Sequence, residues 1–287
     1  MLADAPNLEG RVALVTGATR GIGRGCALAL AASGATVYGT GRTEREGDSS
    51  LPGSLESLEA EGEALSGQIV GARCDHREDR DVARVFDRID AEQGRLDLLV
   101  NVAFLLPDEI EPDRNFWETP IDWWDDMIDV GTRSAYVALH HAARRMVGQR
   151  SGLVVNVSSA GARALHLHVA YSAGKSALDR MTQDAATQLA PFGVSVVSIW
   201  PYFVRTERLM EIEHAGEGDW DHDIEGAESQ RFLGHVVASL MLADDLEARS
   251  GGCFTSVELA LAYGVRDQGG ALPSGPRSVD ESFEATD

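Results

Sequence analysis

Tyr171 and Lys175 are the two residues of this sequence whose types and spacing most clearly suit chemistry. Lys175 is the single lysine among 25 basic residues, and a codon preference for arginine explains the imbalance but not the exception. An ammonium is a compact charge on a flexible stem, and it reaches a buried hydroxyl more easily than a planar guanidinium does. Residues four apart share one face of a helix. A nearby cation lowers the pKa of a phenol, so we predict that Tyr171 exchanges a proton with an alcohol or a carbonyl group.

A glycine-rich loop, residues 16–23, follows the first apolar run of the chain. Its glycines allow a tight turn and a close approach of the backbone to a pyrophosphate, which the N-terminus of the next helix then faces. The position at the first strand-to-helix turn predicts a dinucleotide site. The residues expected to bind the cofactor from this loop are Gly17, Thr19, Arg20, Gly21, Ile22 and Gly23.

The end of the second predicted strand indicates which dinucleotide binds. An acid there would accept the ribose hydroxyl of NAD, but the sequence reads Thr40-Gly41-Arg42-Thr43. Arg42 and Arg20 together supply two cations for a 2′-phosphate, so we predict NADP(H) in preference to NAD(H). Asp75, directly after the third strand, is expected near the adenine. Asn101, which ends the fourth strand, is expected near the cofactor ribose.

Strands and helices alternate along the chain, which predicts an α/β fold with a Rossmann-type, doubly wound parallel sheet of about seven strands and helices on both faces. The predicted strands are 11–16, 35–40, 68–73, 96–101, 152–158 and 193–200, with a last strand and helix within 252–263. The predicted helices are 22–32, 54–65, 78–93, 123–147 with an interruption near Gly131, 169–189 and 229–242.

We expect a single catalytic domain at residues 1–266, followed by an acidic, loosely ordered tail at 267–287. Irregular stretches at about 102–120 and 202–228 are predicted to be flexible substrate loops. Aromatic and histidine side chains near the strand ends predict a largely apolar substrate pocket: Phe104, Trp117, His166, His168, Tyr202 and Phe203. The acids and histidine of Asp219–Asp223 resemble metal ligands only superficially, and no metal is expected.

Composition excludes several classes of function. A formal net charge of −21 opposes binding to nucleic acid or to anionic lipid, because such partners need clustered basic residues. The N-terminus lacks the features of a secretory signal, and no apolar run of membrane-spanning length occurs. Three widely spaced cysteines, Cys26, Cys74 and Cys253, suit reduced thiols. We therefore expect a soluble, cytoplasmic protein.

Five motifs occur in order along the chain: Thr16-Gly17-x-x-x-Gly21-x-Gly23, Asn101-x-Ala103, a serine at the end of a strand, Tyr171-x-x-x-Lys175 and Pro201-x-x-Val204-x-Thr206. Together they resemble the short-chain dehydrogenase/reductase family, in which the second motif reads Asn-Asn-Ala-Gly. The resemblance covers about residues 8 to 265. It implies further cofactor contacts from Ala103, Pro201, Val204 and Thr206, and also from Tyr171 and Lys175.

The resemblance also implies catalytic roles. Tyr171 exchanges the proton, Lys175 binds the nicotinamide ribose and tunes Tyr171, and a serine polarises the substrate carbonyl while hydride passes between nicotinamide C4 and the carbonyl carbon. The end of the strand favours Ser159 as this serine, whereas the family spacing of 13 residues before the tyrosine favours Ser158. We take Ser159 as the prediction and keep Ser158 as the alternative.

Gly131 departs from the family pattern, because it stands where the family has an asparagine that holds a water between the lysine and solvent. Within the family, segments such as Phe116-Trp117-Glu118-Thr119-Pro120 resemble the branch called dehydrogenase/reductase SDR family member 1, which shares this glycine and is described as an NADPH-dependent carbonyl reductase. We therefore predict an NADPH-dependent carbonyl reductase or alcohol dehydrogenase for apolar ketones or aldehydes. The alternative is an NADP(H)-binding regulatory protein with vestigial catalysis. A homodimer or homotetramer is expected from the resemblance.

Overall fold

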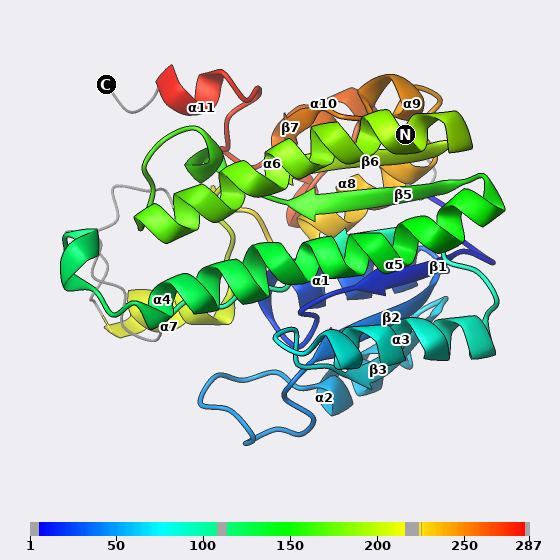
Figure 1. The fold of residues 1–287 in the computed structure, drawn as a ribbon, viewed down its shortest axis with the longest axis horizontal. Coiled ribbons are helices and arrows are strands. Elements are labelled where there is room, and N and C mark those ends of the chain that lie inside the picture. Colours follow the sequence, from blue (N-terminus) through cyan, green and yellow to red (C-terminus); the bar gives the residue numbers. More distant parts are fainter. Residues whose placement is uncertain (1–5, 108–113, 216–223, 225, 285–287) are drawn as a thin grey trace.

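A seven-stranded parallel sheet forms the centre of the computed structural model, which describes residues 6–107, 114–215, 224 and 226–284 (Figure 1). The strands lie in the order β3-β2-β1-β4-β5-β6-β7. Their bounds are Val12–Val15 (β1), Thr36–Gly41 (β2), Gln68–Arg73 (β3), Leu98–Asn101 (β4), Gly152–Val157 (β5), Val194–Trp200 (β6) and Cys253–Thr255 (β7). The strand order reverses between β1 and β4, so the predicted doubly wound α/β sheet is confirmed.

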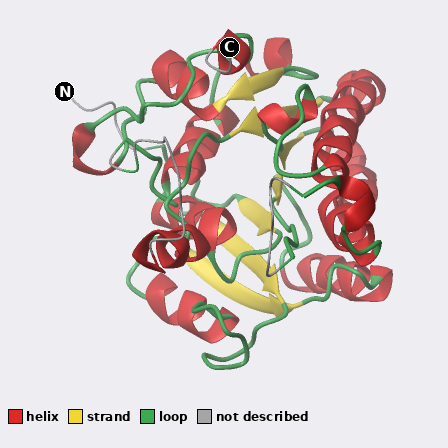
Figure 2. Ribbon diagram, turned by 90° about the vertical axis from the view of Figure 1, so that its left-hand side faces the viewer, coloured by secondary structure: helices red, strands yellow, loops and turns green. Residues whose placement is uncertain are grey.

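Helices cover both faces of this sheet (Figure 2). One layer contains α1 (Gly21–Ala32), α2 (Leu55–Gly62), α8 (Phe232–Met241) and α10 (Ser256–Tyr263). The other contains α3 (Asp79–Glu92), α5 (Ser134–Gln149) and α6 (Val169–Leu189). Successive side chains of a strand point to opposite faces, and in β1 Val15 therefore packs with the first layer while Leu14 packs with the second.

The helical stretch predicted over 123–147 consists of three consecutive segments, α4 (Asp122–Asp125), the π-helical η2 (Asp126–Arg133) and α5. Gly131 lies within η2, where the interruption was predicted. The hydroxyl of Thr132 donates to the carbonyl of Gly174 at 3.2 Å, and a Cβ on Gly174 would lie only 2.8 Å from that hydroxyl. The segment η2 therefore packs closely on α6. Short π-helical segments often occur at functional sites.

The prediction of irregular structure throughout 202–228 is wrong for α7 (Glu207–Ala215). The hydroxyl of Thr206 accepts a hydrogen bond from the N–H of Leu209 at 3.3 Å, which caps the first turn, and the segment is rich in Leu, Met and Glu, which favour helix. A short helix also occurs in the 102–120 stretch. The remaining short helices are η1 (Phe116–Glu118), η3 (Ala160–Ala162), η4 (Ala190–Phe192), α9 (Leu246–Arg249), η5 (Gln268–Gly270) and α11 (Glu281–Glu284).

The described part of the predicted tail contacts the body of the protein. The N–H of Ser229 donates to Asp267 at 2.7 Å, and the hydroxyl of Thr255 donates to the carbonyl of Pro276 at 2.7 Å. The side chain of Val279 is buried. These contacts tie the segment to the N-termini of α8 and α10, while the domain boundary after residue 266 stays a prediction.

Candidate active site

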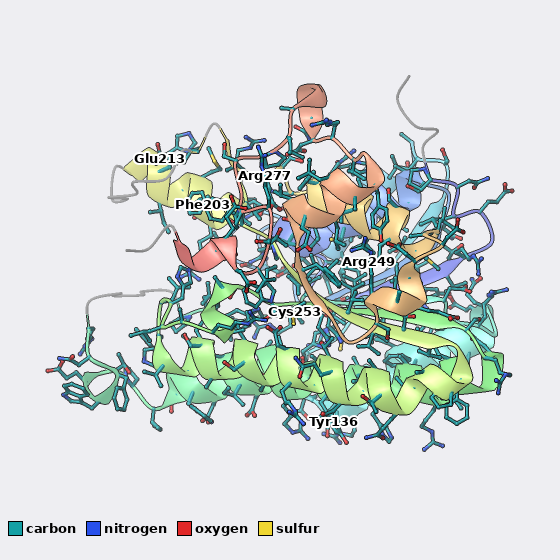
Figure 3. All side chains as sticks on the ribbon, turned by 90° about the horizontal axis from the view of Figure 1, so that it is seen from above. Tyr136, Phe203, Glu213, Arg249, Cys253 and Arg277 are labelled. Carbon is teal, nitrogen blue, oxygen red and sulfur yellow. The ribbon has the colours of Figure 1, made fainter. Side chains whose placement is uncertain are left out.

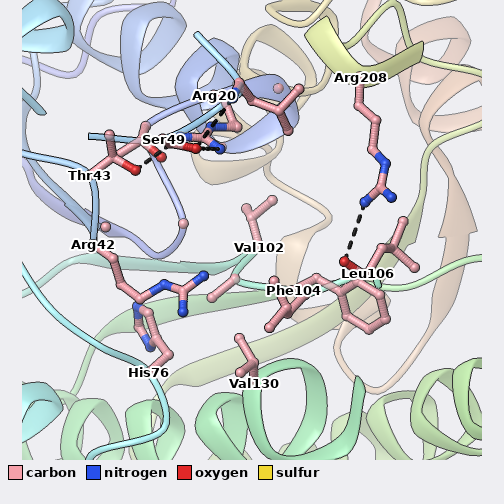
Figure 4. Close-up of a pocket in the computed structure, with 18 of the residues that line it drawn as sticks. Arg20, Arg42, Thr43, Ser49, His76, Val102, Phe104, Leu106, Val130 and Arg208 are labelled. Atoms are coloured by element: carbon pink, nitrogen blue, oxygen red, sulfur yellow. Dashed lines mark hydrogen bonds between the residues drawn. The ribbon is translucent and has the colours of Figure 1, made fainter. Parts of the chain in front are cut away.

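A cavity of about 390 Å³ opens at the carboxyl ends of β1, β2 and β4 (Figure 4). Open parallel sheets bind ligands at this edge, beside the point where the strand order reverses. Many of the residues predicted to bind a cofactor line the cavity: Gly17, Thr19, Arg20, Gly21, Ile22, Gly23, Arg42, Asp75, Ala103 and Thr206. The structure therefore brings together residues from separate strand ends, and their contact with a cofactor stays a prediction.

The glycine-rich loop approaches neighbouring backbone closely at two points. Gly17 has a φ of +68°, and a Cβ there would lie 2.8 Å from the Cα of Ala103. A Cβ on Gly23 would lie 2.1 Å from the carbonyl oxygen of Gly17. Glycine alone fits both positions, so the loop turns tightly and leaves the N-terminus of α1 at the wall of the cavity, where it can bind an anion.

Arg20 and Arg42 lie at one end of this cavity (Figure 4). The guanidinium of Arg20 donates to the hydroxyl of Thr43 at 2.9 Å and to that of Ser49 at 3.1 Å. Burial lowers the pKa of Arg20, the carboxylate of Glu207 opposes this change, and the charge of Arg42 adds to the lowering. Two neighbouring cations suit a dianionic ligand group, which would offset the repulsion between them.

Sequence reasoning missed several contributors to the cavity wall, among them residues 49–51, His76 and Glu207. Residues 49–51 belong to a run rich in Ser, Pro and Gly after the second strand, a pattern that indicates a loop and could have drawn attention to them. His76 lies 2.8 Å from the hydroxyl of Thr40, and burial lowers its pKa to about 4. No local pattern marks Glu207, whose carboxylate accepts a hydrogen bond from the N–H of Gly21 at 2.8 Å.

Asn101, Pro201 and Val204, three of the predicted cofactor contacts, do not line the cavity. The amide of Asn101 donates to the side chain of Asn156 at 2.9 Å and therefore links β4 to β5. Val204 is buried and pairs with Glu228 in a parallel bridge. Within the described residues, Asn101 and Val204 therefore contact neighbouring elements of the fold instead of lining the cavity.

The hydroxyl of Tyr171 lies 3.0 Å from the hydroxyl of Ser159. Tyr171 comes from the first turn of α6, and Ser159 stands just beyond the end of β5, where it caps η3. Ser158 is buried, and its hydroxyl donates to the carbonyl of Lys175 at 3.3 Å. Of the two candidate serines, Ser159 is therefore the one whose hydroxyl meets the tyrosine.

The ammonium of Lys175 is buried on the same face of α6 as Tyr171. It donates to the carbonyl of Val157 at 3.0 Å and lies 5.5 Å from the centre of the Tyr171 ring. Burial lowers the pKa of Lys175 to about 8, and the charge of Asp179 opposes this lowering. Burial also raises the pKa of Tyr171, while the hydrogen bond with Ser159 lowers it. The prediction that Lys175 lowers the pKa of Tyr171 is wrong. The pKa of Tyr171 is raised instead, because desolvation of the phenolate dominates.

The predicted substrate side chains do not all meet at one place. His166 lies near the candidate catalytic tyrosine, with its ring centre 5.9 Å from that of Tyr171. His168 instead caps α6 by accepting from the N–H of Ala170 at 3.1 Å. Trp117 and Tyr202 are exposed, at 69% and 46% of their surfaces. Of the predicted substrate side chains, Phe104 is the one that lines the described cavity.

The doubly wound sheet, with a glycine-rich loop where its strand order reverses, defines a class of dinucleotide-binding proteins. A family model described as short chain dehydrogenase matches residues 11–217. The chain therefore belongs to the short-chain dehydrogenase/reductase family and is an NAD(P)-dependent oxidoreductase.

Known proteins resemble the chain over most of its length. Human dehydrogenase/reductase SDR family member 1 is 39% identical over 278 residues, which cover 93% of this chain and 86% of the human protein. A putative short-chain alcohol dehydrogenase from Sinorhizobium meliloti 1021 superposes with a TM-score of 0.74 at 28% identity, covering 88% of this chain and 96% of that one. A metagenomic short-chain oxidoreductase in complex with NADP gives 0.66 at 28% identity, covering 83% and 93%. The predicted resemblance to the human protein's branch is confirmed.

Neither a membrane-spanning helix nor a cluster of metal ligands occurs among the described residues. No helix there combines the length and the apolar character needed to cross a bilayer. In the same ranges, no group of three or more His, Cys, Asp or Glu side chains is placed to hold a metal ion. The segment Asp219–Asp223 lies outside the described residues. The three cysteines are free, with Cys26 and Cys74 buried.

Proposed function

We propose that this protein is an NADPH-dependent carbonyl reductase, reversible as an alcohol dehydrogenase, that acts on apolar ketones or aldehydes. The observation that carries the proposal is the distance of 3.0 Å between the hydroxyls of Tyr171 and Ser159, one helical turn from the buried ammonium of Lys175. This is the geometry of a proton donor and a second hydrogen-bond donor that can share one substrate oxygen. We place the activity in the cytoplasm.

The bound nicotinamide would supply or accept the hydride. In reduction, Tyr171 gives its hydroxyl proton to the carbonyl oxygen, and Ser159 holds that oxygen by a hydrogen bond. Lys175 binds the ribose from its buried position on the same face of α6 as Tyr171. Ser158 has a structural role in this scheme, since its hydroxyl is already bonded to the backbone of α6.

NADP(H) is the proposed cofactor on the basis of the charges at the arginine end of the cavity. Arg20 is fixed there by hydroxyl groups, Arg42 adds a second cation, and β2 ends at Gly41 rather than at an acid. Gly17 and Gly23 permit the tight turn that leaves the N-terminus of α1 at the cavity wall, where a pyrophosphate can bind. A relative solved with NADP supports the same choice.

The function is tested by following NADPH absorbance with a panel of apolar aldehydes and ketones. We expect turnover with some members of the panel, and a loss of about 100-fold or more in Tyr171→Phe, because the proton donor is removed. The variant should keep its NADPH affinity and its melting temperature. Full activity in Tyr171→Phe would contradict the assignment.

A second candidate is an NADP(H)-binding regulatory protein with vestigial catalysis. The observation that favours it is Gly131, which lacks the side chain through which the family's lysine reaches a water. Tight NADPH binding without turnover on any carbonyl or alcohol would support this function. Turnover that depends on Tyr171 would exclude it.

We also propose that two or more copies of the chain associate through α5 and α6. A groove of about 670 Å³ runs between these helices and is lined by apolar side chains such as Leu139, Ala143 and Met181. Tyr136 is 59% exposed and projects from the outer side of this layer (Figure 3). Light scattering should show a dimer or tetramer, and Tyr136→Arg should dissociate it.

A further inference from the structure

The ring of Phe104 fills the space beside Gly131. Gly131 is buried in the π-helical segment η2, and a Cβ at that position would lie 2.5 Å from both Cδ2 and Cε2 of the ring. Real Cβ atoms do not come that close, so residue 131 can bear a side chain only if the ring moves. The side chains at positions 104 and 131 therefore compete for the same space, and substitutions at the two positions should not have independent effects.

The same ring also contacts both members of the proposed catalytic pair. The ammonium of Lys175 lies 4.7 Å from the centre of the Phe104 ring. The ring of Tyr171 packs against it edge to face, with centres 5.4 Å apart and planes at 86°. Phe104 is in addition part of the cavity wall, at the end away from Arg20 and Arg42 (Figure 4). The same ring is therefore part of the cavity wall and in contact with both Lys175 and Tyr171.

The surroundings of the ammonium show what the ring contributes. Besides donating a hydrogen bond to the carbonyl of Val157, the ammonium of Lys175 lies over two aromatic rings of the described residues, those of Phe104 and Tyr171. The ionisable groups near it in the described part of the chain are Tyr171 and Asp179, both on α6. An aromatic face attracts a desolvated cation but offers no site for a proton. The ring can therefore hold the ammonium without conducting protons.

We propose that Phe104 is a positioning residue that takes the place of the side chain missing at Gly131. Its ring fixes the Lys175 ammonium and the Tyr171 ring, and residues 104 and 131 act as one unit. The inference deepens the proposed function, on which it rests for the roles of Tyr171 and Lys175. It also means that the space beside Gly131 is filled by the Phe104 ring.

The reciprocal exchange of the two residues tests the coupling. Gly131→Asn alone should lower carbonyl turnover by about tenfold or more, because the new side chain displaces the ring, and Phe104→Gly alone should do so because the ring is lost. The double variant should regain most of the activity lost by Gly131→Asn, since the asparagine then has room. Additive losses in the double variant would overturn the proposal.

The single lysine of the chain permits a test that does not depend on turnover. Labelling with lysine carrying ¹³C at Cε gives one NMR signal, and its titration reports the pKa of Lys175 directly. Phe104→Leu keeps an apolar side chain but removes the aromatic face, so the pKa should fall further, because the cation loses a partner. Phe104→Tyr should restore it. Phe192→Leu, an exposed phenylalanine far from the pair, is the matched control.

The outcomes separate this proposal from the proposed function. An unchanged Lys175 titration in Phe104→Leu would overturn the positioning role, even in an active enzyme. Tighter NADPH binding with unchanged kcat in that variant would also overturn it, because the ring would then merely obstruct the cavity. A shifted titration in a protein without turnover on any carbonyl would instead retain the contact and reject the enzymatic function.

Discussion

The hydroxyl of Tyr171 meets that of Ser159 at 3.0 Å, while the neighbouring hydroxyl of Ser158 donates to the backbone of α6. The two serines are adjacent in the chain, but successive side chains at a strand end point in opposite directions. One therefore faces the tyrosine and the other is buried against Lys175. The two serine hydroxyls therefore have different roles: that of Ser159 is available to a substrate oxygen beside Tyr171, and that of Ser158 holds the backbone of α6.

Alanine substitution should separate the two serines. Ser159→Ala is expected to lower kcat by about 100-fold, the usual effect of removing one donor to a developing oxyanion. Ser158→Ala should retain most of its turnover and lose about 1 kcal/mol of unfolding free energy, because it removes one buried hydrogen bond. Steady-state kinetics and denaturant unfolding of both variants check this, and the reverse pattern would make Ser158 the catalytic serine.

Lys175→Arg should lose most activity while it keeps the fold. The ammonium is enclosed by the Val157 carbonyl and two rings, and the wider guanidinium fork cannot make the same contacts in that space. Circular dichroism and melting temperature report the fold, and NADPH oxidation reports the activity. Near-normal turnover would show that the rarity of lysine in this chain has no functional meaning.

Arg42→Ala should weaken NADPH binding by about tenfold or more and leave NADH binding nearly unchanged, because a charge-assisted hydrogen bond to the 2′-phosphate contributes roughly 1.5–3 kcal/mol. Arg45→Ala is the matched control, since it removes the same charge from the same loop but from outside the cavity. Fluorescence titrations with both dinucleotides provide the measurement. Equal affinities for both, unaffected by Arg42→Ala, would reject the phosphate assignment.

Glu207→Gln should strengthen NADPH binding by about two- to fivefold. The carboxylate accepts the N–H of Gly21 at the start of α1 and opposes the lowering of the pKa of Arg20, so it competes with cofactor phosphates for the same positive groups. Glu211→Gln changes the same charge on the exposed side of α7 and should have no such effect. Weaker binding in Glu207→Gln would show that the carboxylate supports the cofactor instead.

Stability should depend on pH through Glu228. Burial raises the pKa of this carboxyl from 4.5 to about 7, although it accepts hydrogen bonds from the N–H of Tyr202 and from Ser256. Between these two pH values the folded protein holds a proton that the unfolded chain releases, so this contribution is complete below pH 4.5 and is lost as the pH rises to 7.

Glu228→Gln should remove that slope, which amounts to about 3 kcal/mol between the two limits. Urea unfolding at a series of pH values measures the difference from the native protein. Glu213→Gln, at an exposed position of α7 (Figure 3), is the control and should leave the slope unchanged. A parallel pH dependence in Glu228→Gln and the native protein would assign the slope to other groups.

The amino-acid sequence by itself determined the features that depend on local geometry. Apolar runs and helical periodicity predicted the strands and helices of the sheet, because burial on one or both faces imposes those patterns. The glycines of residues 16–23 and the four-residue spacing of Tyr171 and Lys175 indicated a cofactor loop and a shared helix face. Each of these inferences needs only a short stretch of backbone with known dimensions.

Tertiary structure decided the relations between residues that are distant in the chain. It placed Phe104 against Gly131, joined Glu207 to Gly21, and chose Ser159 over Ser158 as the partner of Tyr171. It also raised the pKa of Tyr171 through burial, which a sequence cannot express. Such relations depend on how side chains from several elements divide one volume and exclude water from it, and that division exists only once the elements have packed together.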